Sequence, residues 1–274
     1  MNRPTVAPSP PADSESPLVR AGNIPPSFRH GFSTRNGGVS SPPFDTLNLG
    51  GKWGDDVEAV TENRRRFLLA AGAVGPLYVA RQVHGPRIVR VRGSDTPEAI
   101  ARLEADGLCT DRADVTLGVF VADCVPVLLA DSVSGAFAAV HAGWRGTMAG
   151  VVPAAVRALA ELGARPTDLQ VALGPAIGAC CFEVGPEVAA AFAASGAGDA
   201  VLPSPRGRPD RSHVDLAAVL RGQLAEAGVD PSGVVSAGGC TSCQRTRFYS
   251  FRRDGSATGQ MMAVLARVSD DGRA

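Results

Sequence analysis

The sequence predicts an α/β (α+β) fold in which mixed β-sheets are flanked by helices in a single compact domain. Segments with the apolar pattern of strands alternate with segments of helical periodicity along the chain. Several neighbouring strands are joined by connections of hairpin length, which only antiparallel pairs allow, so a purely parallel sheet is not expected. The 274 residues, 45% of them hydrophobic, are enough to bury a sizeable core.

Strands are expected where a short apolar run is bounded by turn-forming residues. Among them, residues 125–130 and 136–140 form a hairpin, because the Gly- and Ser-containing segment 131–135 separates two apolar runs. In chain order, the expected strands are residues 28–33, 77–80, 88–91, 117–121, 125–130, 136–140, 169–173, 234–237 and 260–268.

Helices are expected where apolar residues recur every three or four positions. In residues 55–71, Val60, Phe67 and Ala71 fall on one stripe. Arg64 lies on the same stripe, so its guanidinium must be paired, must reach solvent, or must face a polar cavity. The other expected helices are residues 147–163, with Pro153 in the first turn or at a kink, residues 186–194, and residues 216–227, with Asp215 as the cap and Gly228 at the end.

Residues 1–20 are expected to be a disordered tail that precedes a domain spanning residues 21–274. The tail is rich in proline and serine, and it lacks the basic segment and apolar stretch of a signal peptide. Six cysteines are too few for a secreted disulfide scaffold, so a cytoplasmic protein is expected.

The charge balance gives no reason to expect nucleic acid or a membrane surface as a partner. Lys plus Arg and Asp plus Glu both number 27. The most apolar stretch, residues 115–130, is interrupted by Asp123 and Pro126 and does not predict a membrane span. Arginines cluster at residues 64–66 and 245–253, so binding of a small anionic ligand at one of these clusters remains an alternative.

The expected hairpin brings a thiol and an imidazole together. If Ala130 pairs with Ala136 across the turn, Cys124 lies opposite His141 or Ala142. Antiparallel partners have Cα atoms about 4.5–5.5 Å apart, so both side chains can reach one ligand.

His84 follows another strand-like run and completes a candidate metal site with Cys124 and His141. Two imidazoles and one thiolate suit zinc, and three protein ligands leave one tetrahedral position for water or substrate. We therefore predict that these three residues bind one catalytic metal ion, with Asp123 orienting a ligand histidine. A second interpretation needs no metal and takes Cys124 as a nucleophile with His141 as its base.

The remaining cysteine pairs carry a weaker signal. Cys240 and Cys243 form a Cys-x-x-Cys motif, and Cys180 and Cys181 are adjacent. A single Cys-x-x-Cys pair is weak evidence for zinc, so a packing role is expected for these residues.

Eight motifs in the sequence resemble one known family. They are QVHG at 82–85, ADCVPVLLAD at 122–131, VHAGWRGT at 140–147, GPAIGACCFEVG at 174–185, HGFSTRNGGVS at 30–40, LNLG at 47–50, ENR at 62–64 and FYSFRRDGSATGQ at 248–260. The chain resembles the bacterial purine nucleoside phosphorylases with a laccase-like domain, which are also described as polyphenol oxidases and as peptidoglycan-editing factors. The resemblance extends from about Gly31 to the last expected strand. Gln260 departs from it, since the family usually has arginine at this position.

This resemblance implies that His84, Cys124 and His141 are the metal ligands. It also implies zinc-dependent phosphorolysis of adenosine, inosine and methylthioadenosine, with phosphate as co-substrate and adenosine deamination as a second activity. A cysteine-type hydrolase that edits peptidoglycan precursors, a copper (Cu²⁺) polyphenol oxidase and a non-catalytic binding module remain alternatives. The four histidines are too few for a multicopper centre.

Two further residues are candidates for contact with a nucleoside or phosphate. Arg64 is expected to take part in catalysis and to bind phosphate or ribose, because its guanidinium suits an oxyanion and its stripe position directs it inward. Asn48 is a candidate for holding a sugar hydroxyl, although a turn-forming role competes with it.

Overall fold

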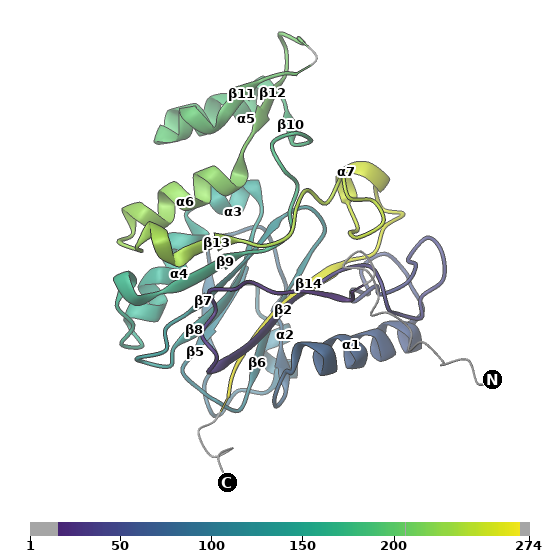
Figure 1. Ribbon diagram of the computed structural model, residues 1–274, viewed down its shortest axis with the longest axis vertical. Coiled ribbons are helices and arrows are strands. Elements are labelled where there is room, and N and C mark those ends of the chain that lie inside the picture. The colour runs from purple at the N-terminus through teal and green to yellow at the C-terminus, as the bar shows by residue number, and fades with distance from the viewer. Residues whose placement is uncertain (1–15, 206, 269–274) are drawn as a thin grey trace, which may run out of the picture.

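The computed structural model describes residues 16–205 and 207–268, which form two β-sheets packed face to face with helices on both outer sides (Figure 1). The larger sheet has the order β13 (Val234–Ser236), β9 (Gln170–Leu173), β7 (Val125–Ala130), β8 (Phe137–Ala142), β5 (Gly107–Thr110) and β4 (Ile88–Arg90). The second sheet has the order β1 (Leu18–Val19), β2 (Phe28–Ser33), β14 (Met261–Arg267), β6 (Thr116–Val121) and β3 (Leu77–Tyr78). Parallel and antiparallel pairs occur in both sheets, so the predicted mixed α/β fold is confirmed.

Strands β7 and β8 lie at the centre of the molecule and are buried along their whole length. Their side chains alternate between two cores, as the period of two in a strand requires. Val127 and Leu129 pack with the helical layer, whereas Leu128 packs toward the second sheet. This double burial explains why both strands are almost entirely apolar in sequence.

The hairpin of β7 and β8 has a register one residue away from the predicted one. The N–H of Asp131 donates to the carbonyl of Ala136 at 2.9 Å, so Asp131 rather than Ala130 closes the turn. Continuing this register places Cys124 level with Gly143, one residue beyond the predicted range. The thiol and the imidazole nevertheless remain at the same end of the hairpin.

Helices cover the outer faces of both sheets. The second sheet is covered by α1 (Val57–Ala71), and the larger sheet by α4 (Val151–Ala160) and α6 (Leu216–Glu226). Asp56 and Asp215 cap α1 and α6 through their side chains, the latter as predicted. Among the described residues, no helix has the length and apolar content to cross a bilayer.

The helix predicted at residues 147–163 is divided into two. A short α3 (Trp144–Met148) precedes α4, and Gly150 between them has a φ of 78°. This left-handed backbone favours glycine and ends the first helix. Pro153 then falls in the first turn of α4, where its missing N–H costs no helical hydrogen bond.

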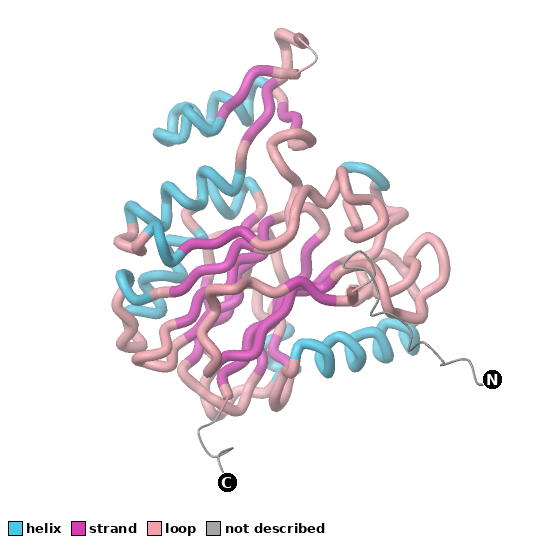
Figure 2. The backbone as a smooth tube through the Cα atoms, in the orientation of Figure 1, coloured by secondary structure: helices cyan, strands magenta, loops and turns pink. Residues whose placement is uncertain are grey.

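A projecting arm carries the third sheet (Figure 2). It consists of β10 (Glu183–Val184), β12 (Ser212–Val214) and β11 (Val201–Pro203) together with α5 (Pro186–Phe192). The remaining helices are α2 (Pro97–Ala101) and α7 (Phe251–Asp254), with short helical turns at Pro166–Asp168, Ala193–Ala197, Gly198–Ala200 and Pro231–Gly233.

The structure describes only part of the expected tail, residues 1–20. Residues 1–15, like residues 269–274 at the other end, lie outside the described residues. Residues 16–20, however, include β1, and Leu18 of this strand packs against the core under α1. Arg20 adds hydrogen bonds to the carbonyls of His30 and Ala70, so burial of one apolar side chain and these polar contacts hold the segment in place.

Candidate metal centre

The side chains of His84, Cys124 and His141 converge at one end of the two sheets. His84 follows β3, Cys124 lies between β6 and β7, and His141 belongs to β8. One donor atom from each of the three residues lies within 4.8 Å of the other two. The Cys124 Sγ atom is 3.9 Å from Nε2 of His84, and the two imidazole rings lie edge to face with centroids 4.8 Å apart. The structure thus brings the three predicted ligands together.

The chemistry of these donors fits a single zinc ion. Two ring nitrogens and one sulfur are the ligand types that zinc prefers, and the contraction needed to bring each donor to about 2.0–2.3 Å from a shared ion is small. Three protein donors leave a coordination position for a reactant, as in catalytic zinc sites.

The carboxylate of Asp106 organises both histidines, and the sequence analysis missed it. It is fully buried and accepts N–H groups of Val83, His84 and Gly85 at 3.0, 2.8 and 2.8 Å. The same carboxylate lies 2.7 Å from Nδ1 of His141. Asp106 therefore fixes the loop that carries His84 and directs Nε2 of His141 away from itself, toward the other donors.

Asp106 could have been predicted from its place at the start of a strand beside His141, but the sequence does not predict that strand. Asp106 directly precedes β5, whose sequence, Gly-Leu-Cys-Thr, is too short and too poor in β-branched residues to stand out. Because β5 pairs with β8, its first residues lie beside His141. An acidic residue at this strand end becomes a candidate only once that pairing is known.

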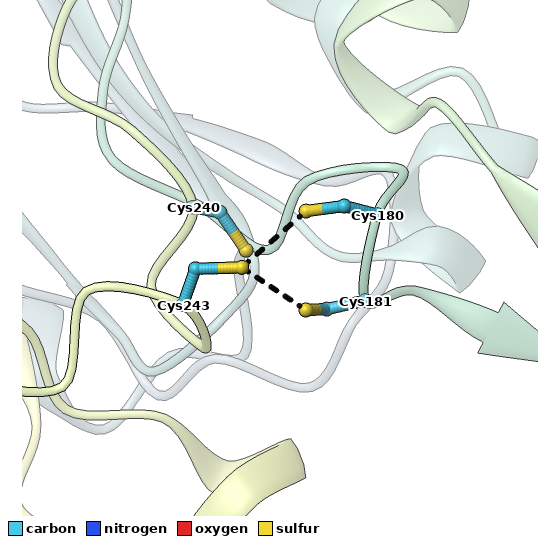
Figure 3. Close-up of side chains that lie close together, drawn as sticks. All are labelled: Cys180, Cys181, Cys240 and Cys243. Carbon is cyan, nitrogen blue, oxygen red and sulfur yellow. Dashed lines mark hydrogen bonds between the residues drawn. The ribbon is translucent and has the colours of Figure 1, made fainter.

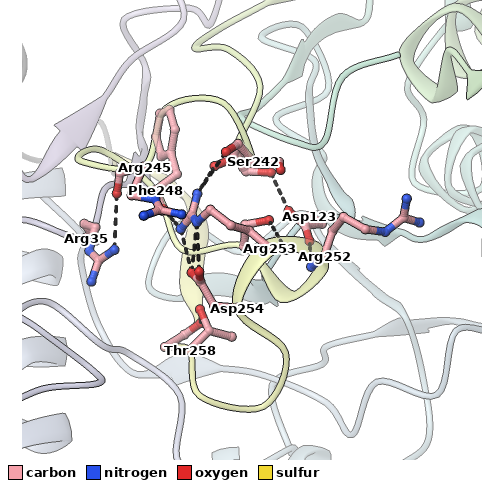
Figure 4. Close-up of polar contacts among 12 residues, drawn as sticks. Arg35, Asp123, Ser242, Arg245, Phe248, Arg252, Arg253, Asp254 and Thr258 are labelled. Carbon is pink, nitrogen blue, oxygen red and sulfur yellow. Dashed lines mark hydrogen bonds and ion pairs between the residues drawn. The ribbon is translucent and has the colours of Figure 1, made fainter. Parts of the chain in front are cut away.

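Asp123 does not have the contact that was expected of it. One of its carboxylate oxygens accepts the hydroxyl of Thr241 at 2.6 Å. The other accepts the backbone N–H of Arg252 at 2.6 Å, and Figure 4 shows Asp123 beside Arg252. Asp106, and not Asp123, forms the hydrogen bond to a histidine of this centre. Asp123 instead ties the turn that carries Cys124 to the start of α7.

Two residues of this centre have an unusual backbone. His84 has a φ of 62° and Asp123 a φ of 90°, and among the described residues these are the only non-glycine positions with positive φ. Such conformations are sparsely populated and persist where the surrounding contacts determine them. At His84 the hydrogen bonds to Asp106 supply those contacts, and at Asp123 the bonds to Thr241 and Arg252 do so.

The charges of Cys124 and His141 are coupled. Burial opposes the thiolate, but the charge of His141 and hydrogen bonds from both histidines lower the pKa of Cys124 to about 6. Burial likewise opposes the imidazolium, but the Cys124 thiolate and the Asp106 carboxylate raise the pKa of His141 to about 9. The metal-free centre therefore holds a thiolate–imidazolium pair near neutral pH.

A cavity of about 590 Å³ opens beside the two histidines, within the size range of small-molecule sites. Trp53 and Phe251 stack in its wall with ring centroids 5.7 Å apart and an interplanar angle of 21°. Lys52, the only lysine of the sequence, lies at its edge. Cys124 faces a second, smaller cavity of about 140 Å³, and Phe251 lines both.

Arg64 is directed inward as predicted but lies one layer behind the cavity. Its Nε donates to the carbonyl of Leu49 at 2.7 Å, and its guanidinium lies 5.1 Å from the ring centroid of Phe120. Burial lowers the pKa of Arg64. Phe120 lines the cavity and Arg64 does not, so Arg64 supports the wall.

The side chain of Asn48 is used entirely within the protein. Its amide group donates to the carbonyl of Gly50 and to the carboxylate of Asp55, and its oxygen accepts the N–H groups of Gly50 and Gln260. With both donors occupied, Asn48 has a turn-forming role rather than the predicted contact with a sugar hydroxyl. Gln260, where the sequence departs from the family pattern, does line the cavity.

The two remaining cysteine pairs, for which a packing role is expected, lie together (Figure 3). The thiols of Cys180, Cys181, Cys240 and Cys243 are all within 4.8 Å of one another. The Cys-x-x-Cys motif therefore has a partner pair, which the sequence did not reveal.

Comparison with known proteins places the chain in a family. Residues 29–268 match the family described as "Multi-copper polyphenol oxidoreductase laccase". The chain belongs to this family. It is 40% identical over 258 residues to a protein of Deinococcus radiodurans named "Purine nucleoside phosphorylase", covering 94% of this chain and 95% of the relative. It is 38% identical over 246 residues to "Purine nucleoside phosphorylase YlmD" of Geobacillus stearothermophilus, covering 86% and 89%.

Solved structures of relatives share the whole fold. The crystal structure of YlmD from Geobacillus stearothermophilus has a TM-score of 0.84 and 35% identity, covering 93% of this chain and 97% of its own. A Bacillus licheniformis hypothetical protein YfiH has a TM-score of 0.85 and 32% identity, covering 93% and 98%.

The histidines of this chain do not provide a multicopper centre of the kind that the family description names. Of the four, His30 accepts the N–H of Ala21 in the core, and His213 contacts the carbonyl of Ala179 beside the arm. Only His84 and His141 belong to the centre. Two imidazoles and one thiolate suffice for one ion, and a copper cluster needs more imidazoles than these.

Asp106→Asn is expected to weaken metal binding. An asparagine amide cannot accept all the hydrogen bonds that the carboxylate accepts, so the His84 loop and the His141 ring lose their fixed orientation. We expect zinc affinity to fall about 10–100-fold, measured by competition with a chromophoric chelator. Asp131→Asn is the matched control, because Asp131 is equally buried and binds its own turn at the opposite end of the hairpin. Equal losses in both variants would contradict the role given to Asp106.

The lowered pKa of Cys124 predicts an unusual pH dependence of alkylation in metal-free protein. The thiolate fraction should rise through pH about 6 and be complete near neutral pH, whereas an ordinary thiol titrates near 8.5. The rate of iodoacetamide labelling at Cys124, followed by peptide mass mapping, should show this midpoint. Cys109 is an internal control, because burial raises its pKa to about 11 and should leave it unlabelled. A Cys124 midpoint above pH 8 would refute the thiolate–imidazolium pair.

Proposed function

We propose that this protein is a zinc-dependent purine nucleoside phosphorylase that acts on adenosine, inosine and methylthioadenosine, with adenosine deamination as a second activity. The observation that carries the proposal is the position of the 590 Å³ cavity, which opens on a centre of two imidazoles and a thiolate and has a stacked aromatic pair in its wall. The names of the Deinococcus and Geobacillus relatives support the same activity.

Phosphorolysis sets three requirements for the site. A phosphate oxygen attacks the anomeric carbon, the C–N bond to the purine breaks, and the purine retains the electron pair and takes up a proton. Zinc bound at His84, Cys124 and His141 would supply positive charge that stabilises anionic oxygens. The protein must also hold the purine, bind phosphate and keep the donor residues in place.

The cavity wall contains groups suited to the first two of these tasks, and Asp106 serves the third. The faces of Trp53 and Phe251 suit the flat, apolar purine, because aromatic rings stack on any base. Lys52 offers an ammonium to phosphate at the cavity edge, the task that the sequence gave to Arg64. The carboxamide of Gln260 can donate or accept a hydrogen bond. In this proposal Arg64 and Asn48 hold the wall and touch no substrate.

The decisive experiment is an assay of base release on protein of defined zinc content. We expect release of adenine or hypoxanthine to depend on phosphate, to produce a sugar 1-phosphate, and to vanish in Cys124→Ala and after chelation. Ammonia release from adenosine without phosphate measures the deaminase activity separately. Base release that persists without phosphate, or that survives in Cys124→Ala, would refute the phosphorylase.

Two substitutions separate the proposed contacts within the cavity. Trp53→Ala should raise KM for the nucleoside about tenfold, since stacking contributes about 1–3 kcal/mol per base. Lys52→Ala should raise KM for phosphate and leave KM for the nucleoside nearly unchanged. Each variant is the control for the other in steady-state kinetics with both substrates varied. A uniform fall in kcat in both variants, with both KM values preserved, would contradict these assignments.

A cysteine hydrolase is the second candidate, and the Cys124–His141 pair favours it. A thiolate beside an imidazolium that is itself bound to a carboxylate is the arrangement of a nucleophile, its base and an orienting residue. Cys124 also faces its own cavity of about 140 Å³. Release of amino acids from peptidoglycan precursor peptides by chelator-treated protein would favour the hydrolase over the phosphorylase.

We also infer a cytoplasmic location. None of the six cysteines is in a disulfide, which is typical of proteins in a reducing compartment. Phosphate and nucleosides as substrates are in keeping with the same compartment.

A further inference from the structure

Four thiols gather outside the proposed catalytic centre, where the base of the arm meets the C-terminal loop. Cys180 and Cys181 lie just before β10, and Cys240 and Cys243 lie in the loop after β13. The Sγ atom of Cys243 is 3.6 Å from that of Cys180 and 3.4 Å from that of Cys181, although Cys243 is 63 and 62 positions away from them in the chain (Figure 3).

We propose that these four cysteines bind a second zinc ion in a structural tetrathiolate site. Zinc–sulfur bonds of about 2.3 Å in a tetrahedron place neighbouring sulfurs about 3.8 Å apart. The measured separations of 3.4 and 3.6 Å, within a group no wider than 4.8 Å, are close to this value. Cys243 lies near both thiols of the opposite pair, which is the arrangement of four ligands around one ion rather than of a single disulfide.

A backbone hydrogen bond stabilises the thiolate of one of the four cysteines. The N–H of Gly178 donates to the sulfur of Cys240 at 3.3 Å, and such a bond favours the charged form. Arg252 donates to the carbonyl of Cys181 at 3.1 Å, and Arg253 donates to the carbonyl of Ser242 at 3.2 Å (Figure 4). A guanidinium thus lies beside each of the two cysteine loops. Arg253 is paired with Asp254 at 2.7 Å, so Arg252 is the cation that offsets part of the net negative charge of four thiolates around one divalent ion.

This site is separate from the catalytic centre but connected to it by hydrogen bonds. Thr241, between the two cysteines of the motif, donates its hydroxyl to Asp123, the residue before Cys124. The backbone N–H of Thr241 also donates to the carbonyl of Ala176. The second zinc would therefore fix the loop that supports the Cys124 turn and join the arm to the two-sheet body.

Cobalt loading distinguishes this site from the first, because cobalt(II) reports its ligands in the visible spectrum. Full-length Cys124→Ala protein, which lacks a complete catalytic centre, is stripped of metal and titrated with cobalt under reducing conditions. We expect uptake of one equivalent, with the intense d–d bands and the sulfur-to-cobalt charge-transfer band of a tetrahedral tetrathiolate. Wild-type protein should take up two equivalents.

The double variants identify the ligands. Adding Cys243→Ser to Cys124→Ala should abolish the tetrathiolate spectrum, whereas adding Cys109→Ala, at a buried thiol outside both groups, should leave it intact. Should Cys243→Ser fail to fold, Cys180→Ser at an exposed position should shift the spectrum to that of three sulfurs and one oxygen. Failure of Cys124→Ala protein to bind cobalt would overturn the proposal. So would a tetrathiolate spectrum unchanged in the serine variants, or thiol titration of untreated protein showing these cysteines in disulfides. Loss of phosphorylase activity plays no part in this test, so the two proposals stand or fall separately.

Discussion

The centre depends on one buried carboxylate. Burial by itself would raise the pKa of Asp106, yet the hydrogen bonds from His141 and from the backbone at residues 83–85 lower it. The hydrogen bonds by which Asp106 orients His141 and the loop at residues 83–85 thus also keep its carboxylate charged. The carbonyl of Asp106 also accepts the N–H of His141 at 2.7 Å, so backbone and side chain act on the same residue. Asp106 joins three parts of the protein into one rigid unit. They are strand β5, the loop in which His84 has a left-handed backbone, and the central hairpin.

The sequence predicts the parts of this site that lie close together in the chain, and it does not predict the parts that depend on distant pairings. Cys124 and His141 belong to one hairpin, whose two apolar runs and turn are visible in the sequence. The sequence therefore predicts that the thiol and the imidazole lie close together, although the predicted register differs from the observed one by one residue. Asp106 and the four-thiol group could not be predicted in the same manner. Both depend on pairings between segments distant in the chain, and the strand that positions Asp106 is short and holds a glycine. Spacing in sequence carries no information about such contacts.

The predictions for Arg64 and Asn48 were limited for another reason. Helical periodicity gives the face of a helix that points inward but not the depth at which its side chains end. Arg64 does point inward, and it meets Leu49 and Phe120 before it reaches the cavity. Asn48 follows the same logic, since a buried amide must satisfy its own hydrogen bonds before it serves a ligand. Polar residues that the sequence places near a site can thus belong to the frame around it.

Gly143 shows how closely that frame encloses the His84, Cys124 and His141 side chains. A Cβ atom at this position would lie 2.8 Å from Cδ2 of His84 and 2.9 Å from the sulfur of Cys124, distances that real contacts do not reach. Position 143 therefore accommodates main-chain atoms only, and a substitution there cannot change the shape of the site without displacing His84 or Cys124. The shape of the neighbouring cavity can be changed instead at its lining side chains, such as Trp53, Phe120 and Gln260. Side chains can thus be exchanged around the cavity mouth of this protein while the main chain beneath the three donors stays the same.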